Sequence, residues 1–532
     1  MALRLRDIPL GLDEDEALLP AKASRELGLA VSDLLDFRIV RKAIDARKKP
    51  KVLRIYTVEF RVKSEVDSTR RVQQHPRLEL VVPLAVPTPV VSSRPQRLLV
   101  VGMGPAGLFA ALQLARCGHR VTLVERGRPV EERVRDVRRF WEGGRLDPES
   151  NVQFGEGGAG TFSDGKLTTR VNHPWIRYVL ETLVACGAPE EILLQAKPHV
   201  GTDRLRLVLL RLRRMLLELG VEIHYSTRLT GLLQRQGRVC GGVLNDAEEL
   251  LADALVLAPG HSARDTYGML DQLGVAMESK PFAIGLRVEH PSGLINRIQY
   301  GHASHPRLPA AEYALTWNDP ESGRGVYSFC MCPGGEVVIA SSEADGLVVN
   351  GMSSLSRAGD RSNSALVVAV RRDDFPGTDP LAGVRFQQQW ERKAFIAGGG
   401  DHYAPAQNLP AFLGRAGGAL RAGCRPGVRE AALEEVLPAF VSQGLRRALP
   451  QFDKRMRGFV SAEATLIGVE TRTSAPLRIL RGDDGQSLSH PGLYPAGEGA
   501  GYAGGIMSAA LDGLRVAEQI TAQAVSQTGV DH

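Results

Sequence analysis

Cysteine is scarce in this chain of 532 residues, and no long uninterrupted apolar segment occurs in it. The best candidate for a membrane span, residues 98–115, is broken by glycines and by Pro105, so we expect no membrane partner. Residues 1–20 contain basic side chains but no continuous apolar stretch, and we do not expect a signal peptide there. The six cysteines are scattered, which fits free thiols in a reducing compartment, so we expect a cytoplasmic protein.

The rest of the composition is that of an ordinary globular protein. Hydrophobic residues make up 43% of the chain and charged residues 24%. The length predicts two or three domains rather than a single core. The net charge of +6 permits an acidic partner without requiring one.

The most informative stretch is residues 97–127. An apolar, β-branched run typical of a buried strand is followed by Gly102, Gly104 and Gly107 in the spacing G-x-G-x-x-G, and then by a helical apolar pattern. These glycines permit a tight turn, close approach to a pyrophosphate and close packing of helix on strand. Glu125 ends the next strand 21 residues after Gly104, where this fingerprint places a carboxylate for ribose hydroxyls. We interpret the stretch as a dinucleotide site.

Residues 151–171 form a second glycine-rich segment, after a helix predicted at 130–142. Its five glycines indicate backbone that passes close to a ligand, and the alternative is a flexible surface loop. Hydroxyl and charged groups lie among the glycines: Thr161, Ser163, Asp164 and Lys166.

Two later segments also end strands with glycine. The strand at 254–258 is followed by Gly260 and His261; the histidine is a candidate acid–base group, with a structural histidine as the alternative. A strand at 492–496 leads into a glycine-flanked helix start, as expected if one long cofactor is held at both ends. That start contains Gly497, Glu498, Gly504, Gly505 and Ile506. Between the segments we expect a helix over 202–219, capped by Thr202 or Asp203, and a β-meander over 221–244.

Residues 1–91 are predicted to form a small α+β unit, ended by the turn-rich segment 86–96. Residues 34–44 have helical apolar spacing, and residues 52–62 alternate like a strand. A basic run here predicts either a solvated face or a docking surface for nucleic acid or an acidic protein. The run comprises Arg38, Arg41, Lys42, Arg47, Lys48, Lys49, Lys51 and Arg54, opposed within it only by Asp45.

From residue 281 short apolar runs alternate with turn clusters, which predicts a mostly antiparallel sheet inserted into the first domain. Helices are expected over 386–395 and 429–452, the second interrupted by Pro438. Within the sheet, Cys330 and Cys332 are expected to share one face of a strand. We favour a packing role for them, with a site-lining thiol as the alternative; no other ligands at metal spacing accompany them. A disulfide between them would be strained by strand geometry, so no redox pair is expected.

These motifs resemble known families. The G-x-G-x-x-G with Glu125, ALVLAPG and LYPAGEGAG resemble the glutathione-reductase-type FAD superfamily. TFSDGKLTTR, LAPGHSARD, SFCMCPGG, GVETRTSAP and GLYPAGEGAGYAGGI resemble, more closely, the bacterial family of uncharacterised FAD-dependent dehydrogenases. The resemblance implies FAD and a redox role but names no substrate. It also implies that Glu498 meets the ribitol or pyrophosphate end of FAD and that the helix after Gly505 faces the flavin ring. Because no second G-x-G-x-x-G is present, NAD(P)H would have to dock transiently as an electron donor.

The sequence therefore predicts an α/β protein. A glutathione-reductase-type FAD-binding Rossmann domain is expected over 96–280 and 456–532, a β-rich substrate domain over 281–455, and a small α+β domain over 1–91. We expect an oxidoreductase that transfers a hydride between FAD and a small substrate. The alternatives are a flavoprotein docked on nucleic acid or a partner protein through its basic N-terminal unit, and a flavin-dependent sensor without turnover.

The expected cofactor-binding residues are Gly102, Gly104, Pro105, Ala106, Gly107, Glu125, Arg126, Gly158, Thr161, Ser163, Gly260, Gly497, Glu498, Gly504, Gly505 and Ile506. The expected catalytic residues are Lys166, His261 and Arg472, grouped near the carboxyl ends of the strands, with bracing of its own loop as the alternative for Arg472.

Overall fold

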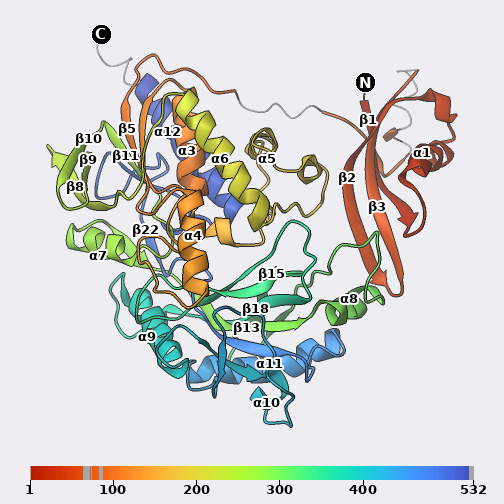
Figure 1. The fold of residues 1–532 in the computed structure, drawn as a ribbon. Helices are drawn as coiled ribbons and strands as arrows, with labels where there is room; N and C mark the ends of the chain where they lie inside the picture. The colour runs from red at the N-terminus through yellow and green to blue at the C-terminus, as the bar shows by residue number, and fades with distance from the viewer. Residues whose placement is uncertain (1, 64–71, 74, 83–87, 527–532) are drawn as a thin grey trace.

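The computed structural model describes residues 2–63, 72–73, 75–82 and 88–526, and it has a mixed α/β fold. A parallel sheet with its helices lies at the upper left of Figure 1, a large mostly antiparallel sheet lies below it, and an N-terminal unit lies to the right. The first two residues of the predicted linker 86–96 lie outside the described residues.

The N-terminal unit is an antiparallel sheet covered by one helix, in the strand order β2-β3-β1-β4. Leu3, Leu5, Val58 and Phe60 lie in its own hydrophobic core. Its elements are β1 (Ala2–Gly11), α1 (Leu19–Leu27), β2 (Leu34–Lys48), β3 (Lys51–Val62) and β4 (Leu78–Leu80).

The expected helix over residues 34–44 is wrong, because this segment is the first part of β2. β2 pairs with β3 along most of its length, but the register shifts at three places. Each shift inserts residues that reverse the alternation of inward and outward side chains. The apolar residues therefore lose the period of two that identifies a strand.

The parallel sheet has the strand order β23-β11-β5-β6-β7 and is buried on both faces. Its strands are β5 (Arg97–Val101), β6 (Arg120–Val124), β7 (Glu222–His224), β11 (Ala254–Leu257) and β23 (Leu493–Pro495). Along β5, Leu98 and Val100 face one hydrophobic core, while Leu99 faces the other. This burial explains the continuous apolar run in the sequence.

Helices from distant parts of the chain cover one face of this sheet. α3 (Pro105–Arg116) packs against α12 (Ile506–Ser526), and the two lie side by side in Figure 1. The helices approach closely at Gly513, where a Cβ atom would lie 2.1 Å from the carbonyl oxygen of Ala106. The other helices of this region are α4 (Val130–Trp141), α5 (Trp175–Ala185), α6 (Thr202–Glu218) and α7 (Arg264–Gln272).

Two local expectations for this region are wrong. Residues 221–225 do not belong to the meander, because β7 pairs in parallel with β6; the meander is β8 (Leu229–Arg235), β9 (Arg238–Leu244) and β10 (Glu248–Leu251). Neither Thr202 nor Asp203 caps α6, whose N-cap is Gly201 without a side-chain bond. The Thr202 hydroxyl instead donates to the Thr161 carbonyl oxygen at 2.6 Å, and the Asp203 carboxylate accepts from the backbone N–H of Leu355 at 2.8 Å.

The second large sheet has the strand order β14-β15-β18-β13-β21-β19-β20, with α8 (Ser292–Tyr300), α9 (Ala382–Ala397), α10 (Leu409–Phe412) and α11 (Ala439–Arg455) around it. Its strands are β13 (Phe282–Pro291), β14 (Thr316–Asn318), β15 (Gly325–Cys332), β18 (Arg361–Val370), β19 (Ala404–Asn408), β20 (Val428–Glu430) and β21 (Thr465–Glu470). Two short pairs accompany it: β16 (Glu336–Ile339) with β17 (Val349–Met352), and β12 (Met277–Ser279) with β22 (Leu477–Ile479).

Two sequence-based boundaries in this region do not coincide with the structure. β21 pairs with β13 and β19, so this sheet continues past the boundary expected at residue 456. Of the helix expected over 429–452, the part before Pro438 is wrong, because residues 428–430 form β20; the expected interruption at Pro438 is confirmed, since α11 starts directly after it. Proline is favoured at such a helix start because it has no N–H to leave unpaired.

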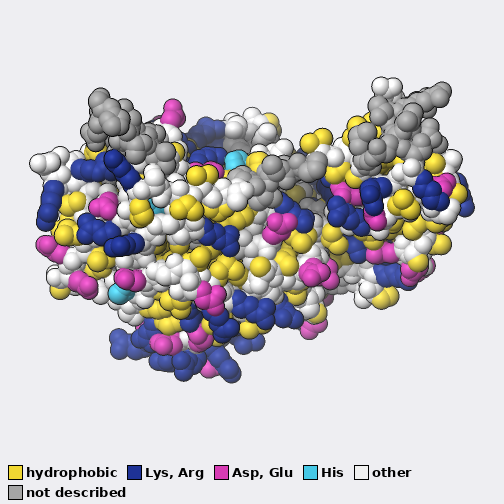
Figure 2. Space-filling model, turned by 90° about the horizontal axis from the view of Figure 1, so that it is seen from above, with side chains coloured by type: hydrophobic (Ala, Val, Ile, Leu, Met, Phe, Trp, Pro, Cys, Tyr) yellow, Lys and Arg dark blue, Asp and Glu magenta, His cyan; other side chains and the backbone are white. Residues whose placement is uncertain are grey.

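The basic run of the N-terminal unit is partly neutralised by acidic side chains from other strands and turns. Arg38 pairs with Glu59 at 2.6 Å, and Lys42 pairs with Glu16 at 2.9 Å. Lys49, at the turn between β2 and β3, donates to the carbonyl oxygen of Ile298 in α8. On the face seen in Figure 2, basic and acidic side chains are interspersed over this unit, at the right of the picture. The sequence missed these pairs because the acids lie outside the run.

Within the described ranges, no helix is long and apolar enough to cross a membrane. The same ranges contain no group of three or more His, Cys, Asp or Glu side chains that could hold a metal ion.

Candidate active site

A cavity of about 390 Å³ lies between the carboxyl edge of the parallel sheet and the large antiparallel sheet. Seventeen of the nineteen predicted site residues line it, although they come from six separate segments of the chain. They are Gly102, Gly104, Pro105, Ala106, Glu125, Arg126, Gly158, Ser163, Lys166, Gly260, His261, Arg472, Gly497, Glu498, Gly504, Gly505 and Ile506.

Two predicted residues do not line this cavity. Thr161 is 1% exposed, and its hydroxyl donates to the carbonyl oxygen of Glu156 at 3.1 Å. Gly107 packs inside the turn, where a Cβ atom would lie 1.9 Å from the carbonyl oxygen of Gly102. Thr161 stabilises the glycine-rich loop, and Gly107 allows α3 to pack on the preceding strand.

The other two glycines of the motif differ from Gly107 in what surrounds them. Gly102 has φ +96°, and a Cβ atom there would lie 2.2 Å from the carbonyl oxygen of Ala258, so this turn requires glycine. Gly104 has extended backbone, and the nearest protein atom to a Cβ would be the Cα of Gly158 at 4.0 Å. The protein itself therefore leaves room for a side chain at Gly104, and the space in front of it belongs to the cavity.

Glu125 joins three backbone segments at one end of the cavity. One carboxylate oxygen accepts from the N–H of Met103 at 2.8 Å, and the other accepts from Gly127 and Gly155, each at 2.9 Å. The oxygen that accepts from Met103 retains a lone pair for a ligand hydroxyl, whereas the other oxygen already accepts two hydrogen bonds. Glu125 thus holds the glycine turn against the glycine-rich loop, a role that its sequence position did not reveal.

Arg133 of α4, which the sequence analysis overlooked, shapes the glycine-rich loop. Its side chain is fully buried, and it donates to backbone carbonyl oxygens of Asn151, Val152 and Glu156 at 2.7–2.9 Å. It also donates to the Gly158 carbonyl oxygen at 2.9 Å. One guanidinium therefore binds carbonyls along the inside of the loop and directs the opposite edge of the loop into the cavity.

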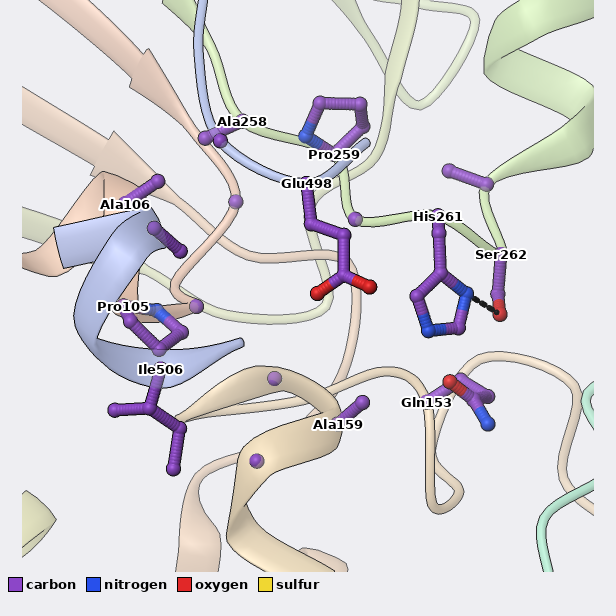
Figure 3. Close-up of a pocket in the computed structure, with 18 of the residues that line it drawn as sticks. Pro105, Ala106, Gln153, Ala159, Ala258, Pro259, His261, Ser262, Glu498 and Ile506 are labelled. Atoms are coloured by element: carbon purple, nitrogen blue, oxygen red, sulfur yellow. Dashed lines mark hydrogen bonds between the residues drawn. The ribbon is translucent and has the colours of Figure 1, made fainter. Parts of the chain in front are cut away.

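Glu498 projects into the cavity from the loop between β23 and α12, and His261 faces it from the loop after β11 (Figure 3). Burial raises the pKa of Glu498 to about 7, although the charge of Lys280 acts in the opposite direction. The first turn of α12 lines the cavity beside it, and no protein atom lies within 4 Å of a Cβ placed on Gly504 or Gly505.

Burial, together with the positive charges of Arg472 and Arg264, lowers the pKa of His261 to about 4. Its Nδ1 lies 3.0 Å from the hydroxyl oxygen of Ser262 (Figure 3). The ring is therefore neutral near pH 7, and the acid–base role expected for it from the sequence would start from this neutral form. A neutral imidazole can still accept or donate a hydrogen bond to a ligand.

Arg472 lies on the cavity wall but directs most of its hydrogen bonds into the protein. It donates to both carboxylate oxygens of Glu391, at 3.0 and 2.8 Å, and to the hydroxyls of Ser262 and Ser342, at 3.0 and 2.6 Å. Arg264 binds the same carboxylate at 2.8–2.9 Å. These bonds leave Arg472 at most one N–H for a ligand, which favours the alternative that it braces its loop.

Lys166 connects the glycine-rich loop to the large antiparallel sheet. Its ammonium group binds the carboxylate of Asp164 at 2.6 Å and the carbonyl oxygen of Met331 in β15. Asp164 is itself paired with Arg357. Burial opposes the charge on Lys166, but the surrounding Cys332, Asp164 and Cys330 raise its pKa, so it remains a cation at the cavity wall.

The large sheet and the segments next to it supply a wall of which only Arg472 was expected as a catalytic residue. Arg287 of β13, fully buried, binds Glu470 at 2.8 Å, the side chain of Asn350 at 2.8 Å and the carbonyl oxygen of Cys330 at 2.9 Å. The sequence signal for this site was a charged residue, Arg287, directly after the uncharged residues 282–286 of a buried strand. The cavity-lining residues of this wall are Phe329, Cys330, Asn350, Glu470, Arg472 and Thr473.

The expectation of a packing role for Cys330 is wrong. Cys330 is half-buried and lines the cavity, while Cys332 is fully buried. The pairing of β15 with β18 contains an irregularity between Phe329 and Cys332, and Cys330 has φ +43°. The regular strand geometry on which the sequence argument relied is absent here, and the bulge aims Cys330 at the cavity.

These features fit a long anionic dinucleotide. The first turns of two helices, α3 and α12, line one cavity, and their N-terminal ends favour negative charge. Open space faces the backbone at Gly104, Gly260, Gly504 and Gly505, so a ligand can approach the main chain closely.

Comparison with known proteins gives the same cofactor. Residues 97–133 match a family model described as an FAD binding domain, and residues 281–473 match one described as FAD-dependent protein, C-terminal domain-like. Residues 3–61 match a domain of unknown function. FAD is thus the cofactor of this protein.

A similar protein of matching length is known. An uncharacterised protein of Clostridium beijerinckii is 44% identical over 529 residues, covering 98% of each chain. Protein FixC of Escherichia coli K12 is 29% identical over 206 residues, which cover 37% of this chain and 44% of FixC.

Among solved structures, the flavin-dependent brominase Bmp2 matches with 14% identity, 81% coverage of this chain, 80% of that chain and a TM-score of 0.37. A geranylgeranyl bacteriochlorophyll reductase-like protein of Thermoplasma acidophilum matches with 13% identity, 82% and 80% coverage, and a TM-score of 0.35. These scores are too low to support an inference about the reaction.

Proposed function

The chain belongs to the same family as the clostridial protein, a family of FAD-dependent proteins, and from this premise we propose that it is an oxidoreductase. The proposed reaction transfers a hydride between FAD and an unidentified small molecule. When bound, FAD supplies the two-electron chemistry, and the protein supplies binding, orientation and electrostatics.

The observation that carries this proposal is the composition of the cavity. Residues of the FAD-binding region and residues of the antiparallel sheet line the same space, so a ligand bound on the sheet side is enclosed together with the cofactor site. The sheet side carries the polar and charged side chains of Asn350, Glu470 and Arg472, and Lys166 of the glycine-rich loop lines the same cavity. Such a wall suits a small polar substrate better than an apolar one.

The residues of the chain have separable tasks in this proposal. Glu125 would accept a hydrogen bond from a ribose hydroxyl, and the first turns of the two helices would favour the phosphates through N–H groups and helix dipoles. Lys166 is a fixed cation that attracts negative charge on a ligand. His261 is neutral and contributes hydrogen bonding rather than charge.

NAD(P)H is proposed as a transient electron donor, docking at the open side of the cavity. The alternative of a flavoprotein docked on nucleic acid is less favoured, because Glu59 and Glu16 pair with Arg38 and Lys42 of the basic run. Nucleic-acid binding through that run would require these ion pairs to be exchanged for phosphate contacts.

The test is an anaerobic reduction screen of the purified protein with its FAD. Loss of the oxidised-flavin absorbance with NADH or NADPH, and its return with an electron acceptor, is the expected result. Dithionite serves as the reference for full reduction. Flavin that is reduced by dithionite but by none of a broad set of donors, and reoxidised by none of the acceptors, would favour a sensor without turnover.

A further inference from the structure

Two thiols occupy the wall of the FAD cavity at different depths. Cys330 is half-buried and lines the cavity, whereas Cys332 is fully buried behind it. The Cys332 thiol lies 3.4 Å from the carbonyl oxygen of Cys330. Gly351 closes over the inner thiol, because a Cβ atom there would lie 2.8 Å from the sulfur of Cys332. Cys330 therefore faces a ligand in the cavity, and Cys332 lies behind it, in contact with Cys330 and closed off from the cavity.

The bulge in β15 creates this arrangement. Phe329 pairs with Ala365 and Cys332 pairs with Asn363, so three steps along β15 match two along β18. Cys330, within the bulge, has the left-handed φ of +43° that residues other than glycine rarely adopt. The backbone is held there by Arg287, which donates to the Cys330 carbonyl oxygen, and by Lys166, which donates to the Met331 carbonyl oxygen.

The charges around the outer thiol favour its ionised form. A hydrogen bond with Cys332 lowers the pKa of Cys330; burial opposes this, and the charges of Arg287 and Lys166 lower the pKa further. The pKa of Cys332 is raised by the same hydrogen bond and by burial. The acidic groups on the facing elements are Glu470 on β21, whose carboxylate is bound to Arg287, and Glu498 before α12. One thiolate next to one thiol is the arrangement in which attack and resolution can follow each other.

We propose that Cys330 and Cys332 form a dithiol centre that reduces an organic disulfide entering the FAD cavity, with Cys330 attacking and Cys332 resolving. The Cys330 thiolate attacks one sulfur of the disulfide, forms a mixed disulfide and releases one thiolate. Cys332 then loses its proton and attacks the Cys330 sulfur, which forms the intramolecular disulfide and releases the second thiolate. Two electrons pass from the cysteine pair to the substrate.

This inference names a substrate class for the proposed site, and it depends on the proposed function only for the return of the disulfide to two thiols. That return takes two electrons and two protons, with the cofactor as the electron source. The exchange itself draws no electrons from FAD, so it can be measured without an electron donor. Its failure is therefore distinguishable from failure of the reduction screen.

The test uses the FAD-loaded protein carrying Cys240→Ser, because Cys240 is the other cysteine that is not fully buried. The probe is the aromatic disulfide DTNB, in slight excess at a pH near 6, where ordinary thiols are mostly protonated. The measurements are release of the coloured thiolate and the mass of the intact protein. Cys330→Ser, Cys332→Ser and, as a matched control away from the cavity, Cys424→Ser are added to this background.

The expected result is release of two equivalents by the background protein, which ends without an adduct and with Cys330 linked to Cys332 in the peptide map. Cys332→Ser should release one equivalent and keep the adduct on Cys330, and Cys330→Ser should react at least about tenfold more slowly. Cys424→Ser should release two equivalents at the same rate as the background protein. The proposal is overturned if the background protein retains a stable adduct, or if it reacts no faster than Cys330→Ser. The stable adduct is tested by the peptide map of the background protein, which needs no variant. This part of the test therefore holds even if a variant folds poorly.

Discussion

Replacement of Gly104 by alanine separates binding of FAD from stability of the fold. Gly104 has φ −77° and ψ 179°, a conformation open to any residue, and its added Cβ would meet no protein atom closer than 4.0 Å. The apoprotein should therefore keep its stability, or gain about 0.4–1 kcal/mol because alanine restricts the unfolded chain. The methyl group occupies space that the cofactor's pyrophosphate needs, so we expect FAD affinity to fall at least about tenfold, or about 1.4 kcal/mol.

The measurements are FAD binding, by titration of apoprotein, and thermal unfolding with and without FAD. A ligand at about 100 times its dissociation constant stabilises a protein by about 2.7 kcal/mol, and a tenfold loss of affinity removes about half of this. Gly268→Ala is the matched control, because a Cβ there also meets no atom within 4 Å but Gly268 lies outside the cavity. Its FAD affinity should not change.

Gly107→Ala provides the opposite comparison. Its Cβ would lie 1.9 Å from the carbonyl oxygen of Gly102, so backbone must shift, and we expect the apoprotein to lose about 1–3 kcal/mol. If Gly104→Ala binds FAD as tightly as the unchanged protein, the pyrophosphate does not lie at this glycine and the cofactor assignment of the cavity is wrong.

Three further predictions concern buried charged groups. Arg133→Met leaves several loop carbonyls unpaired, so we expect the apoprotein to lose at least about 2 kcal/mol of stability in denaturant unfolding. FAD binding, measured by titration, should also be weaker, and an unchanged FAD affinity would contradict the role of Arg133 in shaping the loop. Glu125→Ala should lower apoprotein stability as well as FAD affinity, unlike Gly104→Ala, because three backbone N–H groups lose their acceptor; an unchanged melting temperature of the apoprotein would refute this. The pKa of Glu498 is raised to about 7 in the folded apoprotein, so between about pH 4.5 and 7 the folded protein binds more protons than the unfolded chain. The stability of the apoprotein therefore falls as the pH rises through this window. Glu498→Gln should reduce that fall in a series of melting temperatures, and an identical pH profile would show that Glu498 does not titrate there.

The sequence alone was sufficient for the nucleotide-binding elements, because their information is local. A buried strand, a glycine turn and a helix follow one another without interruption at residues 97–116, and the whole G-x-G-x-x-G spacing lies within them. The same locality made Glu125 and the helix start at Gly504 identifiable. Local patterns failed where the register shifts, as in β2, and where one short strand could join either of two sheets, as with β7.

Only the tertiary structure decided how the site is held and charged. Arg133, Arg287 and Glu391 carry no motif, and their importance arises from partners far away in the chain. The low pKa of His261 likewise depends on burial and on two arginines brought next to it by folding. Residue types and spacing therefore determined that the chain binds a dinucleotide and which stretches surround it, because close approach of backbone to phosphate demands glycine locally. Long-range packing decided which side chains face the cavity and which are ionised there, because both depend on the distances between residues that are distant in sequence.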